Sequence, residues 1–178
     1  CPIQADYGLI DNGKTAVIEM ATASGLELLA PTELNPLKAT TYGTGQLMQD
    51  ALERGAKRFI IGLGGSATVD GGMGCLQAIG LNLSDADGNP ITHGGGGLAD
   101  IAIIDTSGID ERWRSVDILI ASDVENPTLG EKGAAHVFGP QKGADDAMVK
   151  QLEHNLTHCF TLIHEQIGKD VRQLEGGG

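Results

Sequence analysis

The residues best suited to chemistry lie in one glycine-rich stretch in the first half of the chain. An apolar run, 59–63, leads into a segment that combines glycines with two hydroxyl side chains and a carboxylate. Glycine allows positive φ angles and a close approach of the main chain, so backbone N–H groups can surround an anion. The stretch therefore predicts a site for phosphate or carboxylate groups. Its candidate binding residues are Gly64, Gly65, Ser66, Ala67, Thr68, Gly71 and Gly72.

Two aspartates are the candidate catalytic residues. Asp70 belongs to the glycine-rich stretch, and Asp123 follows a second apolar run, 116–121. Ligands of parallel α/β sheets bind at the carboxyl ends of the strands, where a carboxylate can hold Mg²⁺ or accept a proton. Asn126 follows Asp123, and Lys142 lies in a tight turn where it could meet a phosphate. The residue types leave open which carboxylate does which task, whether Asp123 only caps the next segment, and whether Lys142 is merely solvated.

Residues 62–67 also fit the G-x-G-x-x-A pattern of dinucleotide-binding loops, with Asp85 or Asp87 at about the usual distance. Both aspartates lie in a predicted turn instead of at the end of a second strand. A nicotinamide-dinucleotide-dependent oxidoreductase is therefore an alternative only. No glycine-rich segment continues into Gly-Lys-Ser or Gly-Lys-Thr, so a Walker loop is excluded.

Two histidines have a spacing that could indicate a zinc site, but exposure to solvent is the simpler explanation. His154 and His158 lie four residues apart on a predicted helix, a spacing that can hold zinc. Both fall opposite the apolar stripe of that helix, where solvated side chains are expected. We therefore predict no metal-ligating residues of this kind.

The periodicity of apolar residues predicts the elements that must position these groups. The predicted strands are 7–10, 15–19, 58–63, 81–83, 101–105 and 116–121, the first two joined at Asn12-Gly13. Helices are predicted at 45–55, shortly before Gly80, and from Asp145 to Gly168, with a loop over 31–42 and a flexible loop over 94–97. This order predicts a single α/β domain over residues 1–178, with a mixed sheet and helices packed on its faces.

Composition excludes several classes of function. The chain has 12 basic and 24 acidic side chains, and a net charge of −12 repels nucleic acid. No apolar run is long enough to span a bilayer, so no membrane partner is expected. The three cysteines are far apart and odd in number, which favours a reducing compartment and hence the cytoplasm. If phosphates bind here, backbone amides and a divalent cation must supply much of the neutralising charge.

Four segments together resemble the type 1, bacterial-type glycerate kinase family. They are 41–47, 61–72, 121–127 and 137–143, in the order that the family has them. The resemblance covers essentially the whole chain and implies ATP- and Mg²⁺-dependent phosphorylation of D-glycerate to a phosphoglycerate. Such enzymes have two α/β domains with the active site between them, and this chain resembles the inserted middle domain. Family members are about twice as long, which implies a fragment that is inactive alone.

The resemblance also implies roles for the candidate residues. The stretch 64–72 would bind the transferring phosphate or the glycerate carboxylate, Asp70 or Asp123 would engage the metal or the substrate hydroxyl, and Lys142 would offset negative charge. Val69 stands where asparagine is common in the family. A non-catalytic binding module that keeps the loops of a kinase is a further alternative, and a homodimer is possible.

Overall fold

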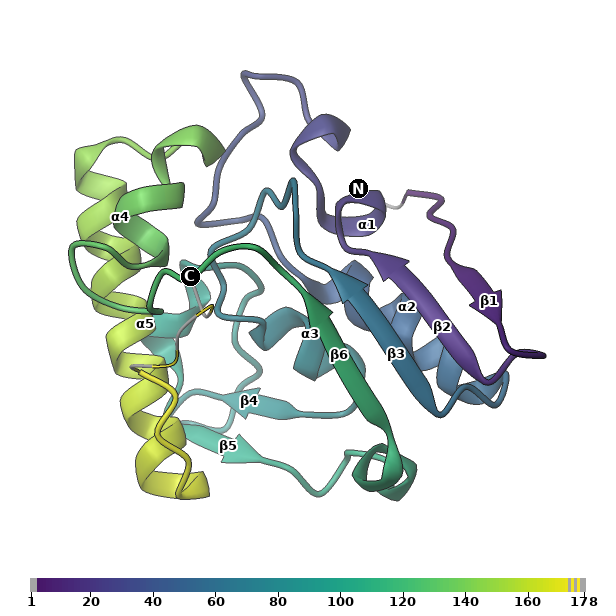
Figure 1. Ribbon diagram of the computed structural model, residues 1–178. Coiled ribbons are helices and arrows are strands. Elements are labelled where there is room, and N and C mark those ends of the chain that lie inside the picture. Colours follow the sequence, from purple (N-terminus) through teal and green to yellow (C-terminus); the bar gives the residue numbers. More distant parts are fainter. Residues whose placement is uncertain (1–2, 173, 175, 177–178) are drawn as a thin grey trace.

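The computed structural model describes residues 3–172, 174 and 176, and its main element is a four-stranded mixed sheet (Figure 1). In spatial order its strands are β1 (Gly8–Ile10), β2 (Thr15–Glu19), β3 (Arg58–Gly62) and β6 (Asp117–Ala121). Strand β1 is antiparallel to β2, whereas β2, β3 and β6 are parallel. The mixed sheet confirms the predicted α/β class, and the continuous apolar run 58–62 does form an inner strand.

The first two strands form the predicted hairpin. Asp11, Asn12 and Gly13 have φ angles of 54°, 57° and 82°, the left-handed backbone that favours Asn-Gly in tight hairpins. The Thr15 hydroxyl donates a hydrogen bond to Asp11 Oδ2 at 2.7 Å. The turn therefore sets the register between β1 and β2 by local chemistry alone.

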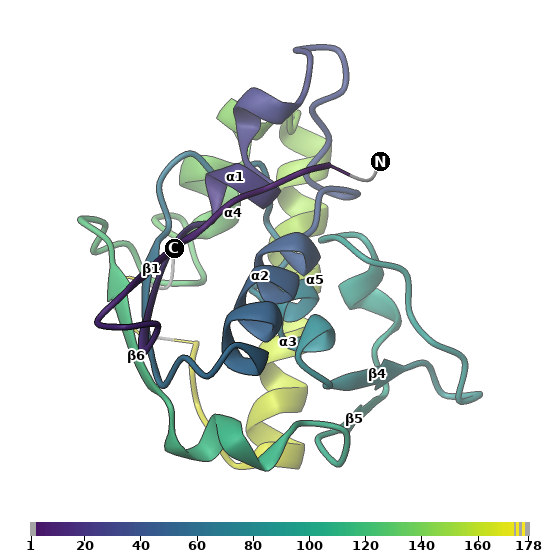
Figure 2. The same ribbon diagram turned by 90° about the vertical axis from the view of Figure 1, so that its right-hand side faces the viewer.

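Helix α2 (Tyr42–Glu53) covers one face of this sheet (Figures 1 and 2). Alternate residues of β2 and β3 point toward it and are buried. With residues of α2 they form one hydrophobic cluster that contains Ala16, Ile18, Met48, Ala51, Leu52, Phe59 and Ile61. On the opposite face, within the described part of the chain, Ile60 is half-buried and Leu119 is 48% exposed.

Helix α2 begins three residues before its predicted start, because tertiary contacts offset the low helix propensity of its glycines. The Gly45 amide donates to the Thr41 carbonyl at 3.2 Å and so belongs to the first turn. A Cβ on Gly45 would lie 2.3 Å from the Cys75 carbonyl oxygen. Glycine is needed there because α2 crosses helix α3 (Met73–Ala78) at close range.

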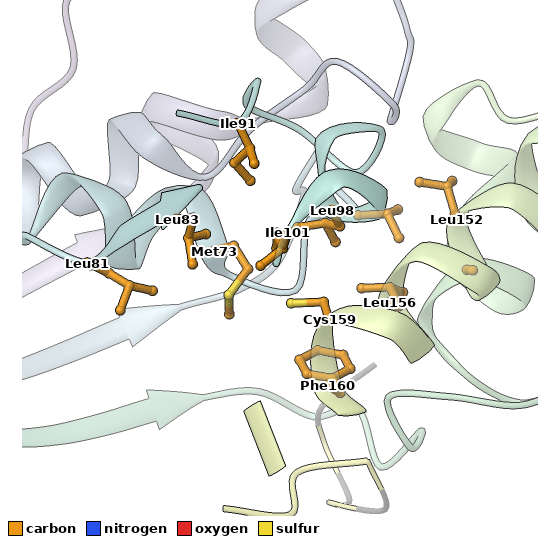
Figure 3. Packing of buried hydrophobic residues seen from close by; sticks show 12 residues of the cluster. Met73, Leu81, Leu83, Ile91, Leu98, Ile101, Leu152, Leu156, Cys159 and Phe160 are labelled. Carbon is orange, nitrogen blue, oxygen red and sulfur yellow. The ribbon is translucent and has the colours of Figure 1, made fainter. Parts of the chain in front are cut away.

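Apart from β6, most of the second half of the chain packs around helix α5 (Asp146–Ile167). As predicted, Asp145 caps this helix by accepting from the Met148 amide at 2.8 Å, and Gly168, with φ 78°, ends it. Strands β4 (Asn82–Ser84) and β5 (Ile103–Asp105) form their own antiparallel pair and do not join the main sheet. Figure 3 shows the second hydrophobic cluster, which includes Val69, Met73, Leu83, Leu98, Leu152, Leu156 and Phe160.

The glycine run 94–97 predicts a flexible loop, but in the structure this loop is closely packed. A Cβ on Gly95 would lie 2.4 Å from Leu152 Cδ2, so these glycines let the loop approach α5. The buried Asn155 side chain donates to the carbonyls of Gly95 and Gly96 at 2.9 and 3.3 Å. The loop is therefore fixed to the long helix.

The remaining elements are short. They are α1 (Ala21–Ser24), α4 (Ala134–Phe138), and the 3₁₀ turns η1 (Leu26–Leu28), η2 (Gly97–Asp100), η3 (Glu111–Ser115) and η4 (Pro140–Lys142). Within the described residues, no helix combines the length and the apolar character that a membrane crossing requires.

Candidate functional site

The glycine-rich loop after β3 divides into an open part and a buried part. Gly64 and Gly65 are exposed, whereas residues 67–70 are buried. A short bridge holds the division in place, because the Ala67 amide donates to the Ser24 carbonyl at 2.9 Å. The amides of 64–66 make no hydrogen bond within the described part of the chain. Amides without a protein partner are the groups that an anion site of the predicted kind requires.

The open part of the loop lines a cavity of about 660 Å³ at the carboxyl edge of the parallel strands. The loop after β3, the segment after β6 and the turn η4 all reach this cavity. The loop after β3 and the segment after β6 meet because Gly62 of β3 pairs with Ala121 of β6, so that both strands end at the same level. The lining includes Gly64, Gly65, Ser66, Ser122, Asp123 and Lys142.

Lys142 supplies the positive charge of the cavity. Its Nζ donates to Ser66 Oγ at 2.8 Å and to the Thr68 carbonyl at 2.6 Å, and the residue is only 8% exposed. Burial lowers the pKa of this amine to about 8, although the nearby Asp70 carboxylate acts in the opposite direction. A largely protonated, partly desolvated amine beside free backbone amides favours an anionic ligand.

Asp123 is the exposed carboxylate of this cavity. The described residues hold no group of three or more histidine, cysteine or acidic side chains that could enclose a metal ion. Mg²⁺ needs no such group, because it commonly takes one or two carboxylates and completes its shell with phosphate oxygens and water. Asp123 therefore fits a Mg²⁺ ion that arrives with a phosphate ligand.

Asp70 has a different environment from Asp123. It is 2% exposed, and its Oδ2 accepts from the Thr41 amide at 2.8 Å and the Thr41 hydroxyl at 2.9 Å. Its Oδ1 accepts from the Gly72 amide at 3.2 Å. Weaker bonds come from the Thr40 hydroxyl and the Gly74 amide. The carboxylate thus joins the start of α2 to the start of α3 and does not line the 660 Å³ cavity.

The other predicted residues of the glycine-rich stretch do not line the 660 Å³ cavity. Ala67 and Thr68 are buried behind the open part of the loop, and Thr68 contributes its carbonyl to Lys142. Gly71 is exposed beside α5, where a Cβ would approach Phe160 Cζ to 2.8 Å. Gly72, like Gly71 and Asp70, lines a second cavity on the inner side of the loop.

Asn126 is a predicted site residue that does not reach the cavity wall. It is not among the residues that line the 660 Å³ cavity, and its side-chain amide donates to the Lys132 carbonyl at 2.8 Å. Sequence reasoning also missed two polar lining residues, Ser122 and Gln141. Each directly precedes a predicted site residue, so their positions beside Asp123 and Lys142 were the available signal.

The loop does not have the geometry of a dinucleotide-binding turn. Such a turn opens directly into a helix whose amino end receives the pyrophosphate. Here helix α3 begins only at Met73, well after residues 62–67. Asp85 lies in a turn, where its carboxylate accepts from the amides of Asp87 and Asn89. The oxidoreductase alternative therefore has no support in the geometry.

Fold and site together define a class: α/β proteins that have a cavity at the carboxyl edge of parallel strands, lined by a glycine-rich loop, a lysine and a carboxylate residue. Comparison with known proteins gives the family. The model of the glycerate kinase family matches residues 1–178, and the chain belongs to this family.

Individual relatives agree with this membership. The chain is 50% identical over 176 residues to a glycerate kinase of Halalkalibacterium halodurans, which covers 99% of this chain and 46% of the relative. It is 49% identical, with the same coverage, to the glycerate 2-kinase of Escherichia coli. A crystal structure assigned to a glycerate kinase 2 of Salmonella typhimurium LT2 has a TM-score of 0.96 and 49% identity, covering 99% of this chain and 47% of its own. The chain thus spans just under half the length of these relatives.

Proposed function

We propose that this chain supplies the anion-binding part of the active site of a kinase that phosphorylates D-glycerate with ATP. The observation that carries the proposal is that residues 64–66, whose amides have no hydrogen-bond partner among the described residues, line one 660 Å³ cavity together with Lys142 and Asp123. Relatives about 50% identical that are named glycerate kinases supply the substrate class. In a polypeptide of their length, we propose residues 1–178 as one α/β unit of a two-domain enzyme.

Phosphoryl transfer asks a protein mainly for positioning and charge stabilisation. We assign the amides of 64–66 and the Lys142 amine to a phosphate group or to the glycerate carboxylate. Mg²⁺, when bound, would neutralise charge on the phosphates, and Asp123 is the residue that would hold it. Asp123 is also the carboxylate that can reach a substrate hydroxyl and take its proton.

Asp70 takes a positioning role in this proposal. Its oxygens already accept hydrogen bonds from Thr41, Gly72 and their neighbours, so little acceptor capacity remains for a metal ion. By fixing the start of α3, the carboxylate fixes the loop that carries the open amides. The two carboxylates that the sequence left equivalent thus receive separate tasks.

The binding test uses this chain and calorimetric titration with MgATP and with D-glycerate. At least one of the two should bind, and Lys142→Met should weaken that binding about 10-fold or more, because a charge-assisted hydrogen bond contributes roughly 1.5–3 kcal/mol. Lys150→Met is the matched control, since Lys150 is exposed on α5. Binding of NAD with neither kinase ligand would instead support the oxidoreductase.

The activity test needs a polypeptide of the relatives' length that contains this chain. It should form ADP from ATP only when D-glycerate is present, and Lys142→Met should reduce that rate while Lys150→Met should not. Normal binding without ADP formation in the longer polypeptide would support a non-catalytic binding module. That result would refute the proposed reaction.

A further inference from the structure

Lys142 is a buried lysine that lines a cavity. The residue is 8% exposed, and it belongs to the wall of the 660 Å³ cavity. The other lysines of the described chain are all exposed, namely Lys14, Lys38, Lys57, Lys132, Lys150 and Lys169. Within residues 3–172, Lys142 is therefore the one lysine whose amine is largely removed from water.

The hydrogen bonds of this amine are those that its neutral form can make. Nζ donates to Ser66 Oγ at 2.8 Å and to the Thr68 carbonyl at 2.6 Å. A neutral amine has two N–H donors and one lone pair, so these two acceptors use both donors. The lone pair of the neutral Lys142 amine is then left for reaction with an electrophile.

The folded chain also increases the neutral share of this amine. Burial lowers the pKa of Lys142 to about 8, although the nearby Asp70 carboxylate acts in the opposite direction. At pH 7 roughly one Lys142 amine in ten is then neutral, against roughly one in three thousand for a lysine with the ordinary pKa of 10.5. Desolvation of this kind is one of the ways in which proteins activate a lysine as a nucleophile.

Ser66 joins this nucleophile to the backbone amides of the glycine-rich loop. Its hydroxyl accepts from Nζ of Lys142, and its own amide is one of the three, 64–66, that have no hydrogen-bond partner in the described part of the chain. Such amides suit a phosphate group. A compound with an electrophilic carbonyl next to a phosphate can therefore engage the amides and the amine together. Acyl phosphates, the mixed anhydrides of a carboxylic acid and phosphoric acid, have this structure.

We propose that Lys142 is a modification site at which acyl phosphates acylate the side-chain amine. The lone pair of Nζ attacks the carbonyl carbon, and a C–N bond forms while the C–O bond to the phosphate breaks. Inorganic phosphate leaves with the electron pair of that bond and takes up the proton that the nitrogen loses. The amide product has no charge, so acylation removes the cation of the anion site. The proposal rests on the anion site of the proposed function but not on phosphoryl transfer from ATP to glycerate.

Acetyl phosphate is the probe, and mass spectrometry of peptides measures the rate of acetylation at each lysine of the wild-type chain. At pH 7 the neutral share favours Lys142 over an ordinary lysine about 300-fold, and the lower basicity of its amine offsets part of this advantage. We therefore expect Lys142 to react at least 10-fold faster than Lys150, which is exposed on α5. Inorganic phosphate should slow the reaction of Lys142 only, because it competes for the amides. In the urea-unfolded chain the two lysines should react at similar rates.

Acetic anhydride is the matched reagent, because it transfers the same acetyl group without a phosphate. It should favour Lys142 over Lys150 less than acetyl phosphate does. The proposal is overturned if Lys150 reacts as fast as Lys142 in the folded chain, if inorganic phosphate does not protect Lys142, or if the two reagents give the same ratio of rates. None of these measurements uses ATP or glycerate, so the proposed kinase reaction can fail while the modification site is confirmed, and the reverse.

Discussion

Lys142 holds a positive charge in a largely buried place, and Lys142→Met removes the charge while keeping a side chain of similar length. Burial lowers the pKa of the amine from its ordinary 10.5 to about 8 in the folded chain. At roughly 1.4 kcal/mol for each pKa unit, the folded chain disfavours the charged amine by about 3 kcal/mol. The nearby Asp70 carboxylate limits that cost without removing it.

The sign of the pH dependence follows from the pH at which the folded and the unfolded chain each release the Lys142 proton. Between pH 8 and 10.5 the unfolded chain keeps the Lys142 proton that the folded chain has already lost. Unfolding therefore takes up a proton in this window, and the stability of the folded state rises with pH. Relative to Lys142→Met, the free energy of unfolding of the wild type should increase by about 3 kcal/mol from pH 8 to 10.5, and should not change below about pH 7.

Urea denaturation followed by circular dichroism measures this difference at a series of pH values. Tyr7, Cys75 and Cys159 also titrate in the alkaline range, because burial raises each of their pKa values to about 12. Their effects are the same in wild type and variant and cancel in the difference. If the two stability curves run parallel from pH 7 to 10.5, Lys142 is not a buried cation, and its assignment to the anion site loses its physical basis.

Further predictions concern packing and the two carboxylates. Gly71→Ala should lower the free energy of unfolding by about 1–3 kcal/mol, because the glycine has a φ of 59° and a Cβ there would lie 2.8 Å from Phe160 Cζ. Gly64→Ala, in open space, should change it by less than about 0.5 kcal/mol in the same urea titration. Asp70→Asn should destabilise the chain by about 2–4 kcal/mol, since an amide cannot replace all the accepting oxygens. Asp123→Asn should leave thermal unfolding unchanged but weaken Mg²⁺-dependent ATP binding in calorimetry about 10-fold or more. Asn155→Leu should cost about 1–3 kcal/mol in thermal or urea unfolding by leaving two glycine carbonyls without their donor, and unchanged stability would contradict the role given to that side chain.

Local signals in the sequence predicted the elements whose causes are themselves local. The Asn12-Gly13 turn fixes the hairpin, the apolar run 58–62 forms the inner strand, and Asp145 and Gly168 mark the ends of the long helix. Each signal acts over a few residues, so no knowledge of the rest of the fold is needed. The α/β class followed from their order.

Features that depend on distant partners could not be predicted in this way. Asp70 is buried because Thr41, 29 residues away, turns two donors toward it. The glycine run 94–97 is packed because Asn155, 60 residues from Gly95, reaches its carbonyls. A glycine run or an aspartate has the same local pattern whether it is open or buried.

In the candidate site, too, single residues could be predicted from local sequence, whereas their arrangement around one cavity depends on distant contacts. Gly64, Gly65 and Ser66 were found from the loop that contains them, and Asp123 and Lys142 from their own turns. That they face one cavity depends on the pairing of β3 with β6, which the sequence suggests only through the order of its apolar runs. Asn126 was selected by its nearness to Asp123 in sequence, but it does not line the cavity, and its side-chain amide instead donates to the Lys132 carbonyl.

Leu63, Ser66 and Lys142 line both the 660 Å³ cavity and the second cavity, of about 420 Å³, and so form a shared wall between them. A group bound in the second cavity that orders this wall would also fix the Lys142 amine and the Ser66 hydroxyl. Thermodynamic linkage then requires that a ligand in the first cavity strengthen the binding of that group by the same factor by which the group strengthens the binding of the ligand. Occupancy of either cavity would thus change the affinity of the other.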